Sequence, residues 1–258
     1  MDINLSPSTR RVACVSAIIP ARNEEDSIAA VVGALLQLVR PDGSPWVHEV
    51  IVADNGSSDG TAIAARAAGA TVIYVATPGY GQACWDASRV ACGDTLLFVD
   101  GDGAADARDG PALLTALEAG ADLAIGTRAQ PDPGSMTASQ VFGNAFACAL
   151  IRWVWGARTT DLGPHRAVSR AAFDRIAMQD RGFGWTVEMQ VRAHLLKMAV
   201  VEVPVAWRAR TGGVSKISGT LRGVVGAGCG ILGMVFRLWR NEQTRVNAHA
   251  VQVVLPGS

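Results

Sequence analysis

Two carboxylates stand one residue apart in Asp100-Gly101-Asp102, directly after the apolar run TLLFV at 95–99. That run has the length and composition of a buried strand, so both carboxylates are expected at a strand end. Such a pair suits Mg²⁺ or Mn²⁺, which keep open positions for substrate phosphates. A calcium loop does not fit, because its pattern needs Asp or Asn and then Gly where this chain has Ala104 and Ala105. Asp100 and Asp102 are the predicted metal ligands, with a solvated acidic turn as the alternative.

A second polar segment, DNGSSDG at 54–60, follows the apolar run at 50–53. It suits either a cap and turn or a nucleotide site in which Asp54 accepts hydrogen bonds from the base or ribose. Gly79-Tyr80-Gly81 resembles a dinucleotide fingerprint only superficially. Cys84 replaces its third glycine, and the segment follows the third predicted strand instead of the first. A dinucleotide-dependent oxidoreductase is therefore disfavoured.

Basic residues gather in two later places: Arg128 follows the fifth predicted strand, and Arg208, Arg210 and Lys216 share one glycine-bearing loop. Arg and Lys bind phosphate oxygens, so these side chains are candidate anion ligands; ordinary surface charge is the alternative. The four histidines show no metal-ligand spacing, and no nucleophile motif of the GxSxG type is present.

The elements that must position these residues alternate between strand and helix through the first half of the chain. The predicted strands are residues 12–19, 50–53, 70–75, 95–99 and 122–126. Asn23 is the predicted N-cap of the first helix, with Glu24, Glu25 and Asp26 in its first turn. The alternation predicts an α/β fold with a doubly wound, mostly parallel sheet. Because ligands of such sheets bind beyond the carboxyl ends of the strands, the acidic residues and the turn at 20–24 are expected on one rim.

The second half is less regular. We expect helices at 139–155, 185–197 and 218–240, a strand at 200–205, and a strand or ordered loop at 160–169. This pattern predicts a tail at 1–11, one domain at 12–217, and a C-terminal helix and tail at 218–258. The uncharged stretch at 223–236 is too short to span a bilayer. The whole predicted helix at 218–240 suits contact with a membrane surface, the sheet or a second subunit.

Composition excludes several classes of protein. Lys plus Arg and Asp plus Glu both number 23, and this zero net charge argues against nucleic acid as a partner. Hydrophobic residues make up 49% of the chain, which predicts a folded protein. The five cysteines form no CxxC, so we expect reduced thiols in a cytoplasmic protein, with peripheral contact at the inner face of the plasma membrane as a further option.

Five segments follow one another along the chain: VSAIIPARNEE, VIVADNGSSDGT, GYGQA, LLFVDGDG and IGTR. In this order they resemble the inverting nucleotide-sugar glycosyltransferases of family 2, which have the GT-A fold. The later segments TDLGPHRAVSR and GFGWTVEMQVRAHLLKMAVVEVPVAWRARTGGVSK are similar to the polyprenyl-phosphate (dolichyl-phosphate) mannose and glucose synthase branch. The resemblance covers about residues 12–222.

The resemblance implies a role for each matching position. It implies that Asp100 and Asp102 hold Mg²⁺ or Mn²⁺ against the diphosphate, and that Asp161 lies near the reacting sugar. It places Arg128 and the loop from Arg210 to Lys216 around the donor and acceptor phosphates. The residues that it implies for nucleotide binding are Pro20, Arg22, Glu24, Asp54 and Gly81.

The chain departs from the branch at three places. Ala104 stands where Gln is frequent, Tyr80 where the glycine turn usually carries Lys, and Gln140 or Val141 where an acceptor-phosphate Arg is frequent.

The expected activity is hexose transfer from a GDP-mannose or UDP-glucose type donor to polyprenyl phosphate. A phosphate acceptor needs little deprotonation, whereas a hydroxyl acceptor needs a base, for which Asp161 is the first candidate. The alternatives are transfer to a soluble, phosphorylated small molecule, a nucleotidyltransferase, and a non-catalytic nucleotide-sugar binding module.

Overall fold

The computed structural model describes residues 12–129, 131–209, 230 and 232–240. Its core is one seven-stranded sheet in the order β3-β2-β1-β4-β6-β5-β7. Six strands run parallel, and β6 runs antiparallel between β4 and β5. The strands are β1 (Val15–Ala21), β2 (Glu49–Asp54), β3 (Thr71–Tyr74), β4 (Thr95–Phe98), β5 (Leu123–Thr127), β6 (Arg166–Ser169) and β7 (Val200–Pro204).

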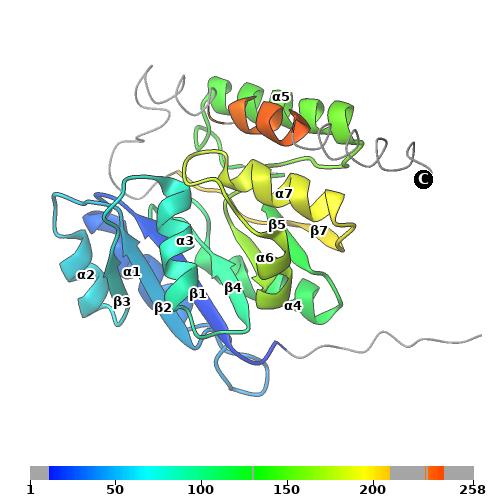
Figure 1. Ribbon diagram of the computed structural model, residues 1–258. Coiled ribbons are helices and arrows are strands. Elements are labelled where there is room, and N and C mark those ends of the chain that lie inside the picture. Colours follow the sequence, from blue (N-terminus) through cyan, green and yellow to red (C-terminus); the bar gives the residue numbers. More distant parts are fainter. Residues whose placement is uncertain (1–11, 130, 210–229, 231, 241–258) are drawn as a thin grey trace, which may run out of the picture.

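Helices cover both faces of the sheet (Figure 1). Along β2, Val50 and Val52 pack into one apolar cluster with α1, α2 and α4, whereas Ile51 and Ala53 pack into a second cluster with α3, α6 and α7. This alternation explains the apolar runs of the central strands β1, β2, β4 and β5, because both faces of these strands are buried, whereas the edge strands β3 and β7 are partly exposed. The helices are α1 (Glu25–Leu36), α2 (Thr61–Ala67), α3 (Tyr80–Val90), η1 (Ala107–Asp109), α4 (Gly110–Glu118), α5 (Ala138–Trp155), α6 (Arg170–Ile176) and α7 (Trp185–Leu195).

The prediction of an α/β fold with a mostly parallel sheet is confirmed, but two local predictions are wrong. The first strand begins at Val15 and not at residue 12. The strand or ordered loop predicted at 160–169 is a loop that ends in the four-residue strand β6, and the short helix α6 that follows had no prediction. Asn23 is not the N-cap of α1; it has a positive φ of 52°, and Glu24 occupies the cap position without a side-chain cap bond.

A third apolar cluster joins α5, α7 and the C-terminal part of the chain. Ala147, Cys148 and Ile151 of α5 pack with Met234 and Leu238 in it. Residues 230 and 232–240 are helical, as predicted, and residues 218–229 lie outside the described part. Figure 1 shows this segment alongside α5 at one end of the molecule. Among the described residues, no helix combines the length and apolarity needed to cross a membrane.

Candidate active site

Three loops meet at the carboxyl ends of β1, β2 and β3 and hydrogen-bond to one another. The amide of Asn55 donates to the carbonyl of Ala21 at 2.8 Å, and the amide of Ser58 donates to Oδ1 of Asn23 at 2.8 Å. The amide of Gly79 donates to Oδ1 of Asn55 at 3.2 Å. The positive φ of Asn23 thus has a local reason: it directs the side chain into the neighbouring loop instead of capping α1.

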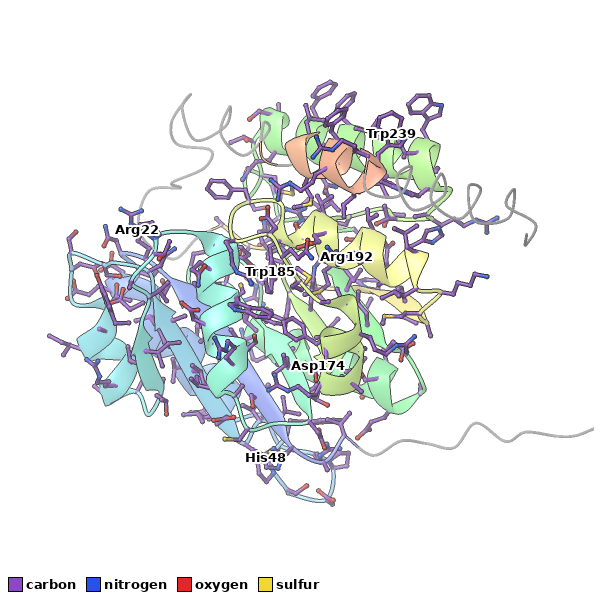
Figure 2. The ribbon with its side chains drawn as sticks, viewed as in Figure 1. Arg22, His48, Asp174, Trp185, Arg192 and Trp239 are labelled. Carbon is purple, nitrogen blue, oxygen red and sulfur yellow. The ribbon has the colours of Figure 1, made fainter. Side chains whose placement is uncertain are left out.

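The residues predicted to bind the nucleotide lie along this edge. Pro20 lies in the part of β1 that continues past its last β4 partner, so its missing N–H leaves no gap in the ladder between β1 and β4. Arg22 is exposed, and Figure 2 places it at the end of the sheet opposite His48. The amide of Glu24 donates to Oγ1 of Thr61 at 2.8 Å. Asp54 is buried at the end of β2 and accepts a bond from the amide of Ser57 at 2.9 Å.

The predicted metal ligands lie just beyond β4. Asp102 is buried, and its Oδ1 accepts a bond from the amide of Ala104 at 2.9 Å. Oδ1 of Asp100 accepts a bond from the hydroxyl of Tyr80 at 3.1 Å. The hydroxyl of Ser27 donates to the carbonyl of Gly101 at 2.7 Å, which ties the acidic turn to α1. Two carboxylates one residue apart are therefore held by neighbours on either side.

Tyr80 is a site residue that sequence reasoning recorded only as a departure from the related branch. Burial, and then the negative charge of Asp100, raise the pKa of Tyr80 well above its usual value. Its hydroxyl consequently keeps its proton and acts as a donor to the carboxylate. The flanking Gly81 packs against a loop, and a Cβ there would lie 2.8 Å from the carbonyl oxygen of Asp180. Close packing accounts for a glycine at this position, and its contact with a nucleotide stays a prediction.

Arg128 and Asp161, far apart in sequence, form one buried pair. The Arg128 amide donates to Oδ2 of Asp161 at 2.6 Å, its Nε donates to the same oxygen at 3.0 Å, and its Nη2 donates to Oδ1. Nη2 also donates to Oδ1 of Asn144 on α5 at 3.2 Å, and the same oxygen accepts the amide of Leu162 at 3.0 Å. The guanidinium is thus fixed on its Nε and Nη2 edge.

Arg166 is a second cation that sequence reasoning did not single out. It lies on β6, is almost fully buried, and donates to the carbonyls of Gly163 and Thr186 and to Oε1 of Gln190. Burial lowers its pKa to about 10. Gln190 in turn donates to the carbonyl of Asp161 at 3.0 Å. The sequence pattern that could have identified it is a single Arg in an otherwise apolar strand segment. A buried charge destabilises the fold unless it is paired, so an Arg at such a position indicates a specific role.

The basic loop begins beside the acidic turn. The amide of Arg208 donates to the carbonyl of Ala104 at 2.8 Å, and its Nη2 forms an ion pair with Asp106 at 2.9 Å. The structure therefore brings the start of this loop to the predicted metal ligands. The predictions for Arg210 and Lys216 lie outside the described residues.

The two carboxylates of the acidic turn, Asp100 and Asp102, provide part of the coordination that a hard divalent cation requires. Within the described ranges, no group of three or more His, Cys, Asp or Glu side chains forms a metal cage. Mg²⁺ and Mn²⁺ do not require one, since one or two carboxylates plus substrate phosphates and water complete their coordination. Asp100 and Asp102 fit this mode, in which the metal and a diphosphate bind together.

The family can be stated from comparison with known proteins. The pattern of the family described as Glycosyl transferase family 2 matches residues 16–176. The chain belongs to glycosyl transferase family 2. An uncharacterized glycosyltransferase of Mycobacterium tuberculosis is 33% identical over 228 residues, which cover 82% of this chain and 93% of the relative.

Two further relatives bear on the donor and the acceptor. An undecaprenyl-phosphate mannosyltransferase of Micrococcus luteus is 32% identical over 233 residues, covering 82% of this chain and 89% of that protein. Glucosyl-3-phosphoglycerate synthase of M. tuberculosis, in complex with Mn²⁺ and UDP-glucose, superimposes with a TM-score of 0.66 at 26% identity, covering 85% of this chain and 79% of that one. This family 2 enzyme is thus a nucleotide-sugar glycosyltransferase with the GT-A fold, as predicted.

Proposed function

We propose that this glycosyltransferase transfers a hexose from a GDP-mannose or UDP-glucose type donor to the phosphate of a polyprenyl phosphate, with inversion at C1. The observation that carries the proposal is the fixed guanidinium of Arg128. Asp161 binds its Nε and Nη2 edge, so the Nη1 edge is oriented and can donate to a phosphate oxygen. The relative from M. luteus supports the lipid acceptor, because its likeness extends over most of both chains.

The donor would bind along the edge formed by the three hydrogen-bonded loops. Asp54 accepts hydrogen bonds from the base or ribose, with Pro20, Arg22 and Glu24 beside it. Asp100 and Asp102 hold Mg²⁺ or Mn²⁺, which neutralises charge on the departing diphosphate when it is bound. Tyr80 keeps the Asp100 carboxylate oriented. Arg210 and Lys216 stay predicted ligands of the phosphates, supported by the start of their loop beside Ala104.

Asp161 serves this reaction best as the partner that positions Arg128. Both of its carboxylate oxygens already accept hydrogen bonds from that side chain. A phosphate monoester is anionic before it reacts, so no base has to remove a proton from it. If the acceptor were a hydroxyl, Asp161 would have to leave this ion pair to act as a base.

A soluble acceptor is the second candidate, favoured by the likeness to glucosyl-3-phosphoglycerate synthase. The decisive experiment offers the purified enzyme a nucleotide sugar, Mn²⁺ and one of three acceptors: a short water-soluble prenyl phosphate, the matching prenol, or 3-phosphoglycerate. We expect sugar transfer to the prenyl phosphate alone. Transfer to 3-phosphoglycerate without transfer to prenyl phosphate would replace the lipid acceptor by the soluble one.

A matched pair of variants tests the role of Arg128. Arg128→Gln is expected to lower transfer to prenyl phosphate by about 10²-fold, the scale of losing one preorganised charge-stabilising donor. Arg108→Gln removes an exposed arginine that pairs only locally with Asp106, and is expected to retain activity. Equal activities of the two variants would show that Arg128 does not belong to the active site.

A further inference from the structure

The outer side of α5 and of the helix at 232–240 carries an unusual number of exposed aromatic rings. On α5, Phe142 is 72% exposed, Phe146 49% and Trp153 83%. On the C-terminal helix, Phe236 and Trp239 are exposed as well. We name these five residues the aromatic surface. In Figure 2 aromatic side chains stand away from this pair of helices on the side that faces away from the sheet, with Trp239 labelled among them.

Helix α5 is apolar on both of its faces. Its inner side packs into the third apolar cluster through Ala147, Cys148 and Ile151. Its outer positions repeat at helical spacing and are also apolar: Ala138, Phe142, Ala145, Phe146, Ala149 and Trp153. The helix also carries Ser139, Gln140, Asn144 and Arg152, so it is not apolar all round. An apolar side of a helix that stays exposed marks a site of contact with lipid or with another protein. Here the stacked rings of Phe142 and Phe146, with centroids 6.2 Å apart, keep 72% and 49% of their surface exposed among the described residues.

The charged side chains that the two helices carry among their described residues have one sign. Arg152 on α5, Arg158 just after it, and Arg237 and Arg240 on the C-terminal helix are exposed. Neither helix carries an Asp or Glu among its described residues. Nη1 of Arg237 lies 3.9 Å from Oδ2 of Asp180, a long distance for an ion pair. Exposed aromatic rings bordered by arginines match the interfacial layer of an anionic bilayer, where rings enter the headgroup region and guanidinium groups meet lipid phosphates.

The aromatic surface is directly connected to the candidate active site. Asn144, on the same helix, accepts the hydrogen bond from Arg128 that helps to fix the guanidinium. Figure 2 shows Arg22, which follows β1, toward the end of the molecule where α5 lies, and His48, which precedes β2, at the opposite end. Contact of α5 with a bilayer would therefore bring the ends of the strands, and not their beginnings, close to the lipid.

We propose that the aromatic surface docks this enzyme onto an anionic lipid bilayer, with α5 as the principal contact. This inference rests on the proposed lipid acceptor and adds how the enzyme reaches it. The earlier prediction of a membrane contact at 218–240 named only the C-terminal helix. The structure adds α5, whose three exposed rings lie on the helix that contacts the site. An acidic lipid is complementary in charge to these exposed arginines, whereas a neutral apolar partner is not.

The test is flotation of the full chain with vesicles of phosphatidylcholine, with and without phosphatidylglycerol. The wild type is expected to float with anionic vesicles and to be released by high salt. The double variant Phe142→Ser/Phe146→Ser should bind at least about tenfold more weakly, because two apolar side chains no longer enter the interface. Ile63→Ser is the control, since Ile63 is 74% exposed on α2, away from this surface. It should bind like the wild type.

Three results would overturn the docking proposal. The first is wild-type protein that floats with neither vesicle, and the second is a double variant that floats as well as the wild type. The third is a dimer in solution that Phe142→Ser/Phe146→Ser converts to monomer without changing flotation, which would assign the surface to a second copy. Transfer to water-soluble prenyl phosphate, measured in the same variants without vesicles, is expected to be unchanged. If the wild type shows transfer but no flotation, docking fails and the proposed function stands.

Discussion

His165 is a buried imidazole whose protonation is expected to destabilise the fold. It precedes Arg166 in the segment that starts at Asp161, and its carbonyl accepts the amide of Gly126 at 2.8 Å. Its side chain is fully buried, and within the described part of the chain neither Nδ1 nor Nε2 has a hydrogen-bond partner. Burial lowers its pKa from 6.5 to about 4, and the charge of Asp106 only partly opposes this. The neutral ring is therefore the form that the folded protein tolerates.

The sign and size of the effect follow from this pKa difference. Between pH 6.5 and 4 the unfolded chain binds a proton at His165 that the folded chain does not, so the free energy of unfolding decreases as the pH falls through this window. Above pH 6.5 His165 is neutral in both the folded and the unfolded chain, so this contribution to the free energy of unfolding is fully present. At pH 5 the loss amounts to about 2 kcal/mol, since each pKa unit corresponds to about 1.4 kcal/mol. For a chain of this length, that loss lowers the melting temperature by about 4–8 °C.

The assay compares thermal unfolding at pH 8 and pH 5 for the wild type, His165→Phe and His194→Gln. Carboxylates also titrate below pH 5.5, so the quantity of interest is the difference between variants in their loss of stability. His165→Phe keeps a ring of similar size without a titrating group and should lose about 2 kcal/mol less than the wild type. His194 is exposed and bonds to the carbonyl of Trp155, so replacing it leaves His165 in place and should preserve the wild-type loss. Equal losses for the wild type and His165→Phe would refute the reasoning.

Three further predictions concern the site itself. Asp100→Asn and Asp102→Asn are each expected to abolish transfer while the protein stays folded by circular dichroism; full activity of either variant, or of the wild type in excess EDTA, would contradict the metal assignment. Tyr80→Phe removes the hydroxyl that donates to Asp100 and should weaken Mn²⁺ binding about tenfold in an electron paramagnetic resonance titration; unchanged affinity would show that the bond does not orient the carboxylate. Asp161→Asn should reduce kcat nearly as much as Arg128→Gln, because the guanidinium loses the partner that fixes it; a pH–rate profile that loses only its acidic limb would instead indicate a general base.

Local sequence patterns predicted much of the fold. The apolar runs before Asp54 and Asp100 were long enough for buried strands and too short for helices, and the structure has β2 and β4 there. Parallel strands share a direction, so the prediction that their acidic ends occupy one edge followed from the alternation alone. Family membership was also accessible, because the motifs lie in the strand–helix turns in a fixed order.

Those patterns could not predict which strands and side chains distant in the sequence come together. The strand β6 enters the sheet antiparallel between β4 and β5, and nothing in RAVS specifies either its direction or its neighbours. That insertion places Arg166 and His165 beneath the site. The preceding loop brings Asp161 to Arg128, 33 positions away in the sequence.

The sequence by itself determined the alternation of strands and helices, the acidic pair after the fourth strand and the enzyme family, because each depends on the order and spacing of nearby residues. Only the tertiary structure decided that Tyr80 donates to Asp100, that Asp161 is engaged by Arg128, and that the outer side of α5 remains exposed. The helical spacing of apolar residues predicts that they lie on the same side of the helix. Whether that side is buried depends on which distant segments pack against it, and those contacts have no local signature.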